Sequence, residues 1–65
     1  MDPNETLRQM RRLAKRIVED RGRLARGWIT EMPLDDVVQL AEWFESLDEW
    51  MSRGGFPPEE WKGGA

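Results

Sequence analysis

No cysteine and no histidine occur among the 65 residues of this chain, and this absence strongly constrains what the chain can fold into. A chain of this length buries only about 60% of its unfolded surface, so one small core leaves it marginally stable. Disulfide bonds cannot add stability, and a structural zinc ion would lack its usual ligands. Four tryptophans and two phenylalanines remain as a source of packing energy, because each can bury about 150–250 Å². The sequence therefore predicts a single domain, 1–65, stabilised by dense aromatic packing, by self-association, or by both.

Charge is divided unevenly along the chain, whose net charge is −3. Residues 1–26 carry a net charge of +4, and residues 27–65 carry −7. The chain is thus a basic half joined to an acidic half. Its overall acidity opposes the approach of nucleic-acid phosphate at long range, although the first half is basic.

The first predicted helix covers about residues 3–21. Asp2 is a favoured N-cap, and Pro3 is tolerated at the first helical position. Apolar residues then recur at spacings of three and four and form one face: Leu7, Met10, Ala14, Ile17 and Leu24. Gly22 weakens the pattern, so the prediction ends the helix near residue 21 and leaves open a continuation to Ala25.

Residues 22–34 are predicted to connect two helices, because glycine and proline punctuate them and no helical period is sustained. Trp28, Ile29 and Met32 lie in this segment and are too apolar for a fully solvated loop. We expect these three side chains to fold back as a lid on the helix pair.

The second predicted helix covers about residues 35–53 and begins with Asp35 as its N-cap. Its inward stripe consists of Val37, Leu40, Ala41, Phe44, Leu47 and Met51. Trp43 and Trp50 lie along one edge of this stripe and widen the apolar arc to roughly half the helix circumference, at about 100° per residue. One short partner helix cannot cover so wide an arc, so part of it is expected to meet another chain.

Residues 54–65 form the predicted tail. Gly54 or Gly55 can take the left-handed conformation that ends a helix, and Phe56 follows where a residue often packs back on the last turn. Two prolines then prevent the helix from resuming, and Trp61 offers a further aromatic anchor. The predicted fold is all-α: a two-helix hairpin with a Trp/Pro/Gly-rich tail packed over it, dimerising into a four-helix arrangement.

A distinctive order of residues runs through the second helix and the tail. It consists of Leu40-Ala41, Phe44, Leu47-Asp48-Glu49-Trp50, Ser52-Arg53-Gly54-Gly55-Phe56, Pro58 and Trp61. This order resembles the C-terminal signature of small proteins of unknown function encoded by phages of actinobacteria, of the mycobacteriophage type. The resemblance implies a phage gene product that works in the cytoplasm of a bacterial host, and it assigns no activity or binding residue.

The inventory of side chains argues against catalysis. Acid–base and nucleophilic catalysis usually needs histidine, cysteine, lysine or carboxylates in a dry cleft, and the first two are absent. Four acidic residues of the second helix follow helical spacing, which favours a solvated face over a carboxylate metal site: Glu42, Glu45, Asp48 and Glu49. No uninterrupted apolar stretch is long enough for a membrane span. We therefore expect a soluble, non-enzymatic protein without a cofactor or a bound metal.

Five basic residues crowd one part of the first helix. They are Arg8, Arg11, Arg12, Lys15 and Arg16. Like charges three or four residues apart each cost a helix about 0.2–0.5 kcal/mol, so a counter-charge is expected nearby. The acidic second helix of the same copy or of a neighbouring copy can supply it, and nucleic acid or an acidic protein is the alternative. A membrane surface is disfavoured, because the first helix has no aromatic anchor.

The aromatic edge of the second helix is the candidate protein interface. Its residues are Trp43, Phe44, Leu47, Trp50 and Met51. Because tryptophan is enriched in binding hot spots, we predict a small phage-encoded module that binds a host or phage protein through this edge and through opposed charged faces. Two alternatives stay open: a nucleic-acid-binding accessory protein that uses the basic first helix, and a self-assembling structural component.

Overall fold

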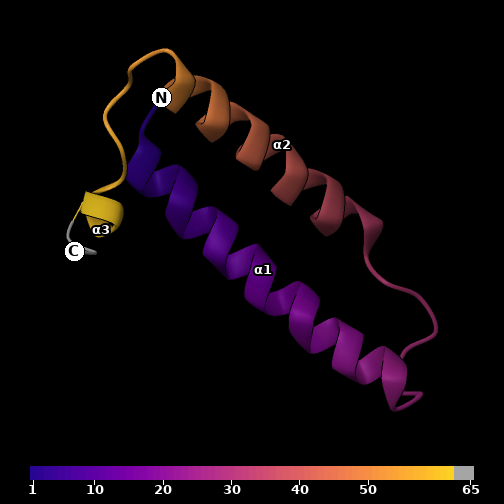
Figure 1. Cartoon of the computed structure of the whole chain (residues 1–65). Helices are drawn as coiled ribbons and strands as arrows, with labels where there is room; N and C mark the ends of the chain where they lie inside the picture. The colour runs from indigo at the N-terminus through magenta and orange to yellow at the C-terminus, as the bar shows by residue number, and fades with distance from the viewer. Residues whose placement is uncertain (63–65) are drawn as a thin grey trace.

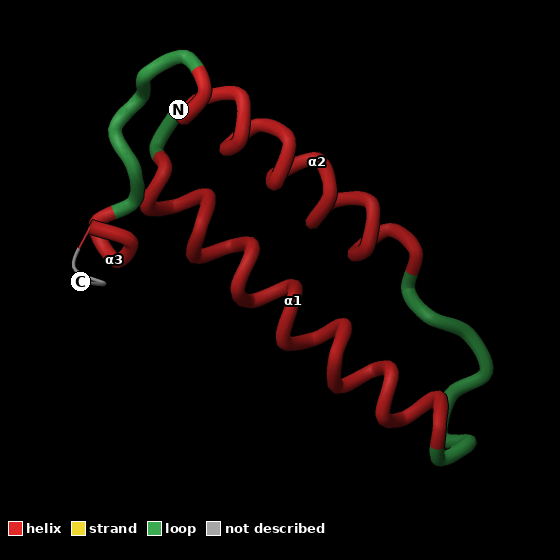
Figure 2. Tube along the Cα trace, viewed as in Figure 1, coloured by secondary structure: helices red, strands yellow, loops and turns green. Residues whose placement is uncertain are grey.

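The computed structural model describes residues 1–62, which form a helical hairpin followed by a short third helix. α1 (Pro3–Ala25) and α2 (Leu34–Ser52) lie antiparallel, and α3 (Glu59–Lys62) lies beside the start of α1 (Figure 1). Within the described range the remaining segments are loops and turns, and no strand occurs (Figure 2). The predicted all-α class and the hairpin are therefore confirmed. Residues 63–65 of the predicted tail lie outside the described residues.

The start of α1 agrees with the sequence prediction. The side chain of Asp2 accepts hydrogen bonds from the backbone amides of Asn4 at 3.0 Å and Glu5 at 3.3 Å, and Pro3 occupies the first helical position. These bonds satisfy amide groups that have no partner inside the helix.

The end of α1 lies beyond the predicted residue 21, because the helix continues through Gly22. Gly27 has a φ of 77°, and the amide of the next residue, Trp28, donates to the carbonyl of Arg23 at 2.8 Å. This arrangement is the usual glycine-terminated helix stop. An interior glycine costs a helix only about 1 kcal/mol, which the longer helix and its complete cap offset.

Gly22→Ala is expected to raise the free energy of unfolding by about 0.5–1 kcal/mol, because alanine loses less backbone entropy in a helix. A Cβ atom at residue 22 would meet only the Arg26 Nη1 atom, at an ordinary contact distance of 3.5 Å. Gly27→Ala is the matched control and should destabilise the fold, since its positive φ strains any Cβ. Chemical denaturation measures both variants, and a loss of stability in Gly22→Ala would contradict the helical state of this residue.

α2 begins at Leu34, one residue earlier than predicted. Pro33 occupies the N-cap position and makes no side-chain capping bond, so the prediction of Asp35 as N-cap is wrong. Asp35 and Asp36 instead lie in the first turn, where their negative charges interact favourably with the positive end of the helix dipole.

The end of α2 is a glycine stop of the same kind as the end of α1. Gly54 has a φ of 90°, and its amide donates to the carbonyl of Met51 at 3.1 Å. The amide of Gly55 donates to the carbonyl of Trp50 at 2.9 Å. These two bonds form the Schellman pattern, so Gly54 is the left-handed residue of the predicted pair.

The buried core is small and lies mainly toward the end of the hairpin where α1 begins and α2 finishes. Its apolar residues are Leu7, Leu13 and Leu47, which are 6%, 6% and 2% exposed. Pro3, the first residue of α1, and Pro58, which directly precedes α3, are also buried. So few buried side chains leave little apolar stabilisation for the isolated chain.

The predicted lid over the connector end does not form from Trp28. Its side chain is 68% exposed, while Ile29 and Met32 are only partly covered. The glycine stop at Gly27 fixes the backbone just before Trp28, and the indole ring stacks with the guanidinium of Arg26, 5.1 Å from the ring centroid. The lid prediction is therefore wrong for Trp28.

Candidate interaction surface

α2 turns a different part of its apolar arc toward α1 than the sequence predicts. Leu47 is buried, and the two tryptophans of the predicted edge, Trp43 and Trp50, are half-buried. The other side of the arc is exposed and consists of Val37, Ala41, Phe44 and Met51. Burying indole rings removes more apolar area from water than burying valine or methionine, which accounts for this rotation.

The indole of Trp50 has partners within its own chain. Its Nε1–H donates to the carbonyl of Phe56 at 2.9 Å. The two rings pack edge to face, with centroids 5.5 Å apart and planes at 87°. Trp50 therefore joins the last turn of α2 to the following loop, and its N–H group has no capacity left for an outside partner.

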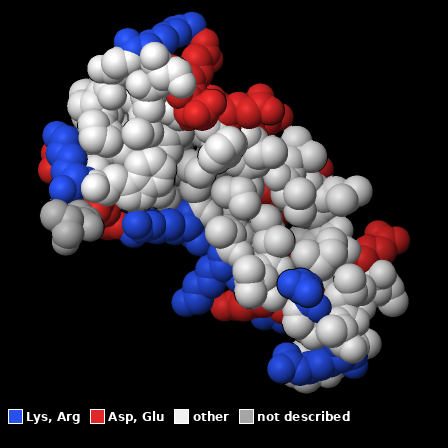
Figure 3. Space-filling model, viewed as in Figure 1, with Lys and Arg blue, Asp and Glu red and all other residues white. Residues whose placement is uncertain are grey.

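The exposed arc of α2 and the apolar residues on the same side of α1 make one largely apolar surface, here named the open face. Its residues are Ala14 and Val18 of α1 with Val37, Ala41, Phe44 and Met51 of α2. At about 100° per residue, Val18 lies on the same side of α1 as Leu7. α3 borders Leu7 through Glu59 and Glu60, and it borders α2 through Trp61, so both sets lie on one side of the hairpin. Figure 3 shows a largely uncharged surface along the hairpin, with most charged side chains at its margins and one basic side chain within it near the connector end.

A notch of about 200 Å³ lies at the α3 end of the open face. It is lined by Phe44, Leu47, Asp48, Met51 and Trp61. Leu47 is its most buried residue, so this member of the predicted interface is reachable only through the notch, whereas Trp61 is 46% exposed. Ligand pockets usually enclose about 300–1,000 Å³, so the notch is the size for a single large side chain.

The predicted charge-contact residues are partly neutralised by acidic side chains. The pairs are Arg8 with Glu5, Arg11 with Glu60, and Arg16 with Asp36, the last at 3.8 Å. Only Asp36 belongs to α2, so α1 itself and α3 supply the other counter-charges. Within residues 1–62, Arg12 and Lys15 form no ion pair. The cluster therefore offers less free charge for phosphate than its sequence suggests.

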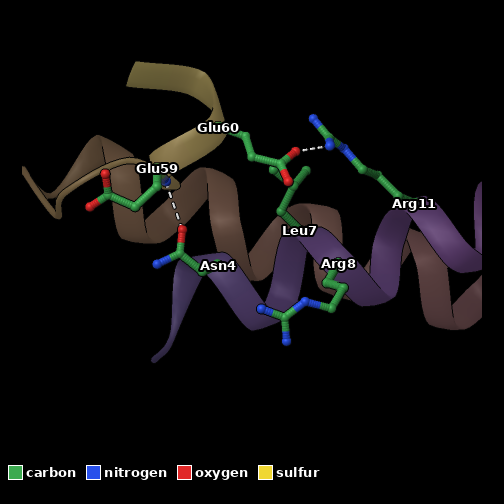
Figure 4. Close-up of a pocket in the computed structure, with 6 residues that line it drawn as sticks. All are labelled: Asn4, Leu7, Arg8, Arg11, Glu59 and Glu60. Atoms are coloured by element: carbon green, nitrogen blue, oxygen red, sulfur yellow. Dashed lines mark hydrogen bonds and ion pairs between the residues drawn. The ribbon is translucent and has the colours of Figure 1, made fainter. Parts of the chain in front are cut away.

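A polar cleft of about 480 Å³ lies between α1 and α3 (Figure 4). Its lining consists of Asn4, Leu7, Arg8, Arg11, Glu59 and Glu60. The backbone amide of Glu59 donates to Oδ1 of Asn4 at 2.6 Å, and Arg11 pairs with Glu60. These polar groups satisfy one another across the cleft, so they hold α3 against α1 and leave few groups to bind a ligand.

Residues 1–62 show neither a metal-binding cluster nor a membrane-spanning helix. Residues 1–62 contain no cluster of three or more acidic side chains placed to hold a metal ion. No helix within the same range is both long and apolar enough to cross a bilayer. The four acidic residues that follow helical spacing on α2 are exposed to solvent: Glu42, Glu45, Asp48 and Glu49.

Comparison with known proteins finds no relative of this chain. No protein-family model matches it, and neither the curated proteins nor the solved structures contain a match. Function must therefore be inferred from the surfaces themselves.

Two features of the surface differ from the sequence prediction. Val37, Ala41, Phe44 and Met51 belong to the predicted inward stripe but are exposed, and of these only Phe44 and Met51 also belong to the predicted interface. Trp28 is exposed and forms no lid. The width of the apolar arc on α2 indicates that some of its residues stay exposed. Which of them face α1 depends on how α2 is rotated about its own axis, and packing against α1 and the tail sets that rotation. For Trp28, the signal is Gly27, which ends α1 immediately before it.

Proposed function

We propose that this chain is a small, non-enzymatic protein-binding module encoded by a phage, and that a second copy covers its open face in a four-helix arrangement. The exposed apolar side chains support this most directly: Phe44 is 59% and Val18 is 69% exposed. Soluble monomers rarely leave a long contiguous apolar surface in water, and such surfaces commonly mark sites of protein association.

The accessible area supports a partner of similar size. The chain exposes 5057 Å², whereas a compact monomer of its 7.7 kDa mass is expected to expose about 4,300 Å². The excess of about 750 Å² is close to the roughly 800 Å² that each partner contributes to a stable complex. A hairpin measuring 44 × 23 × 15 Å lacks a second layer of helices, and a second hairpin supplies that layer.

Pairing through the open face also suits the distribution of charge. Arg11 lies on the side of α1 that carries Leu7, where Glu60 neutralises it. Arg12 of the basic cluster and Glu42 and Glu49 of α2 lie away from the open face and stay in solvent when two open faces meet. These outward surfaces are then free to contact a host or phage protein. The non-enzymatic assignment rests on the absence of histidine and cysteine and on the mutual pairing of the polar groups in the cleft.

Sedimentation equilibrium at micromolar concentration is expected to give twice the mass of one chain. The thermal midpoint should also rise with protein concentration, because dissociation then accompanies unfolding. A mass that remains at 7.7 kDa, together with a midpoint independent of concentration, would refute the proposed pairing.

A further inference from the structure

An exposed tryptophan directly follows the glycine stop at the connector end of the hairpin. Trp28 is 68% exposed, yet its backbone amide donates to the carbonyl of Arg23 at 2.8 Å. The guanidinium of Arg26 lies over its ring, 5.1 Å from the centroid. A tryptophan held in this way loses little freedom when it inserts into another surface, and tryptophan is enriched among binding hot spots.

The notch at the other end of the hairpin has matching chemistry. Its lining is apolar except for Asp48, and its volume suits one large side chain. Neither Asp48 nor Arg26 forms an ion pair within residues 1–62. The Trp28 indole, with the positive guanidinium of Arg26 beside it, thus complements the apolar notch, which has the negative carboxylate of Asp48 in its lining.

Trp28 cannot reach the notch of its own chain. Trp28 precedes the start of α2, and the notch residues Phe44 and Met51 lie along its second half. At 1.5 Å per residue, these residues are about 15–25 Å from the first residue of α2. The connector and α3 accordingly lie at opposite ends of the hairpin (Figure 1). A second copy is therefore the occupant that can bring the two features together.

The position of α3 selects the orientation of that copy. Trp61 borders Phe44 and Met51, so α3 occupies one end of the open face. A second hairpin can cover the face without colliding with α3 only if it places its own connector end there. Trp28 and Arg26 then arrive beside the notch, and two-fold symmetry forms the same contact twice.

We propose that the two hairpins of the dimer lie antiparallel on each other's open face, with Trp28 of each copy filling the notch of the other and Arg26 facing Asp48. This arrangement rests on the proposed self-association and adds the residues that set its orientation.

Trp28→Ala in the full chain is expected to raise the dissociation constant of the dimer about thirtyfold or more, because two-fold symmetry removes this tryptophan contact twice. Val38→Ala is the matched control, because Val38 is 54% exposed on the outer side of α2, and it should leave the constant unchanged. A wild-type chain that stays monomeric overturns the proposed pairing and this arrangement together. A wild-type dimer that Trp28→Ala does not weaken overturns this arrangement alone.

A cross-link gives a second readout that does not remove the tryptophan, since the chain has no cysteine of its own. Chains carrying Arg26→Cys are mixed with mass-tagged chains carrying Asp48→Cys and treated with a short bis-maleimide reagent. Mixed cross-linked dimers are expected to predominate, because an arginine that faces a carboxylate holds the two Cα atoms within reach of such a reagent but beyond the roughly 7 Å that a direct disulfide allows. Cross-linking of each variant mainly with itself, or no cross-linking of a dimeric sample, would overturn the arrangement.

Discussion

Gly55→Ala is expected to lower the free energy of unfolding by about 1–3 kcal/mol, the usual cost of overpacking a filled site. A Cβ atom at residue 55 would lie 2.5 Å from Nε1 and 2.6 Å from Cδ2 of Trp50, which is far inside van der Waals contact. The indole cannot move aside freely, because its N–H group is bound to the Phe56 carbonyl and its ring packs against the Phe56 ring. Urea denaturation followed by circular dichroism, at one fixed chain concentration, measures the change.

Gly54→Ala is the matched control for this clash, because alanine is unfavourable at residues 54 and 55 for different reasons. No atom lies within 4 Å of a Cβ built at residue 54, so only its φ of 90° is unfavourable, at a cost of about 1 kcal/mol. Asparagine tolerates the left-handed region, so Gly54→Asn should cost less than Gly54→Ala, whereas Gly55→Asn should keep the full clash. A smaller loss for Gly55→Ala than for Gly54→Ala would show that the indole does not lie against residue 55.

A double-mutant cycle isolates the contact itself. On a Trp50→Leu background the ring that meets the new Cβ is gone, so Gly55→Ala should become much less destabilising. The two substitutions are therefore expected to be strongly non-additive, while Gly54→Ala should add independently of residue 50.

The helix ends show which parts of the fold can be predicted from sequence. Asp2 and Gly54 act within a few residues of themselves, through a capping side chain and a left-handed backbone, so local sequence identifies both. Gly22 and Gly27 look alike in sequence, but only Gly27 ends α1. The choice between them depends on the summed stability of the extra turn, which includes the pairing of Arg23 with Asp20 at 2.6 Å.

The orientation of α2 could not be predicted in the same way. Hydrophobic periodicity gives the width of the apolar arc on a helix, but it does not show which part of a wide arc faces the partner helix. Trp50 is drawn inward by its hydrogen bond to Phe56, a contact with a residue beyond the helix. Phe44 and Met51 are therefore left exposed, although the same pattern favours them as core residues. Which residues form the candidate surface thus depends on tertiary contacts, and these cannot be predicted from the hydrophobic period of α2.

Phe44→Glu is expected to convert the dimer to monomers across the micromolar range. Phe44 belongs to both the open face and the notch and is 59% exposed in the single chain, so the substitution places a carboxylate where a second copy would bury a ring. Loss of a central aromatic contact costs about 2 kcal/mol or more, and burying an unpaired charge adds to that cost. Val38→Glu adds the same charge to the outer side of the same helix and should leave the dimer intact. Sedimentation of both variants measures the difference.

The thermal midpoint then separates loss of association from loss of fold. The buried core of one chain contains only Leu7, Leu13 and Leu47 as its apolar members among the described residues, so much of the stability of the wild type should come from pairing. The midpoint of Phe44→Glu should therefore be low and independent of concentration. The midpoint of the wild type should fall toward this value on dilution, because both samples then consist of the same monomeric hairpin. A wild-type midpoint that stays constant while Phe44→Glu is lower would instead make Phe44 a determinant of the single-chain fold.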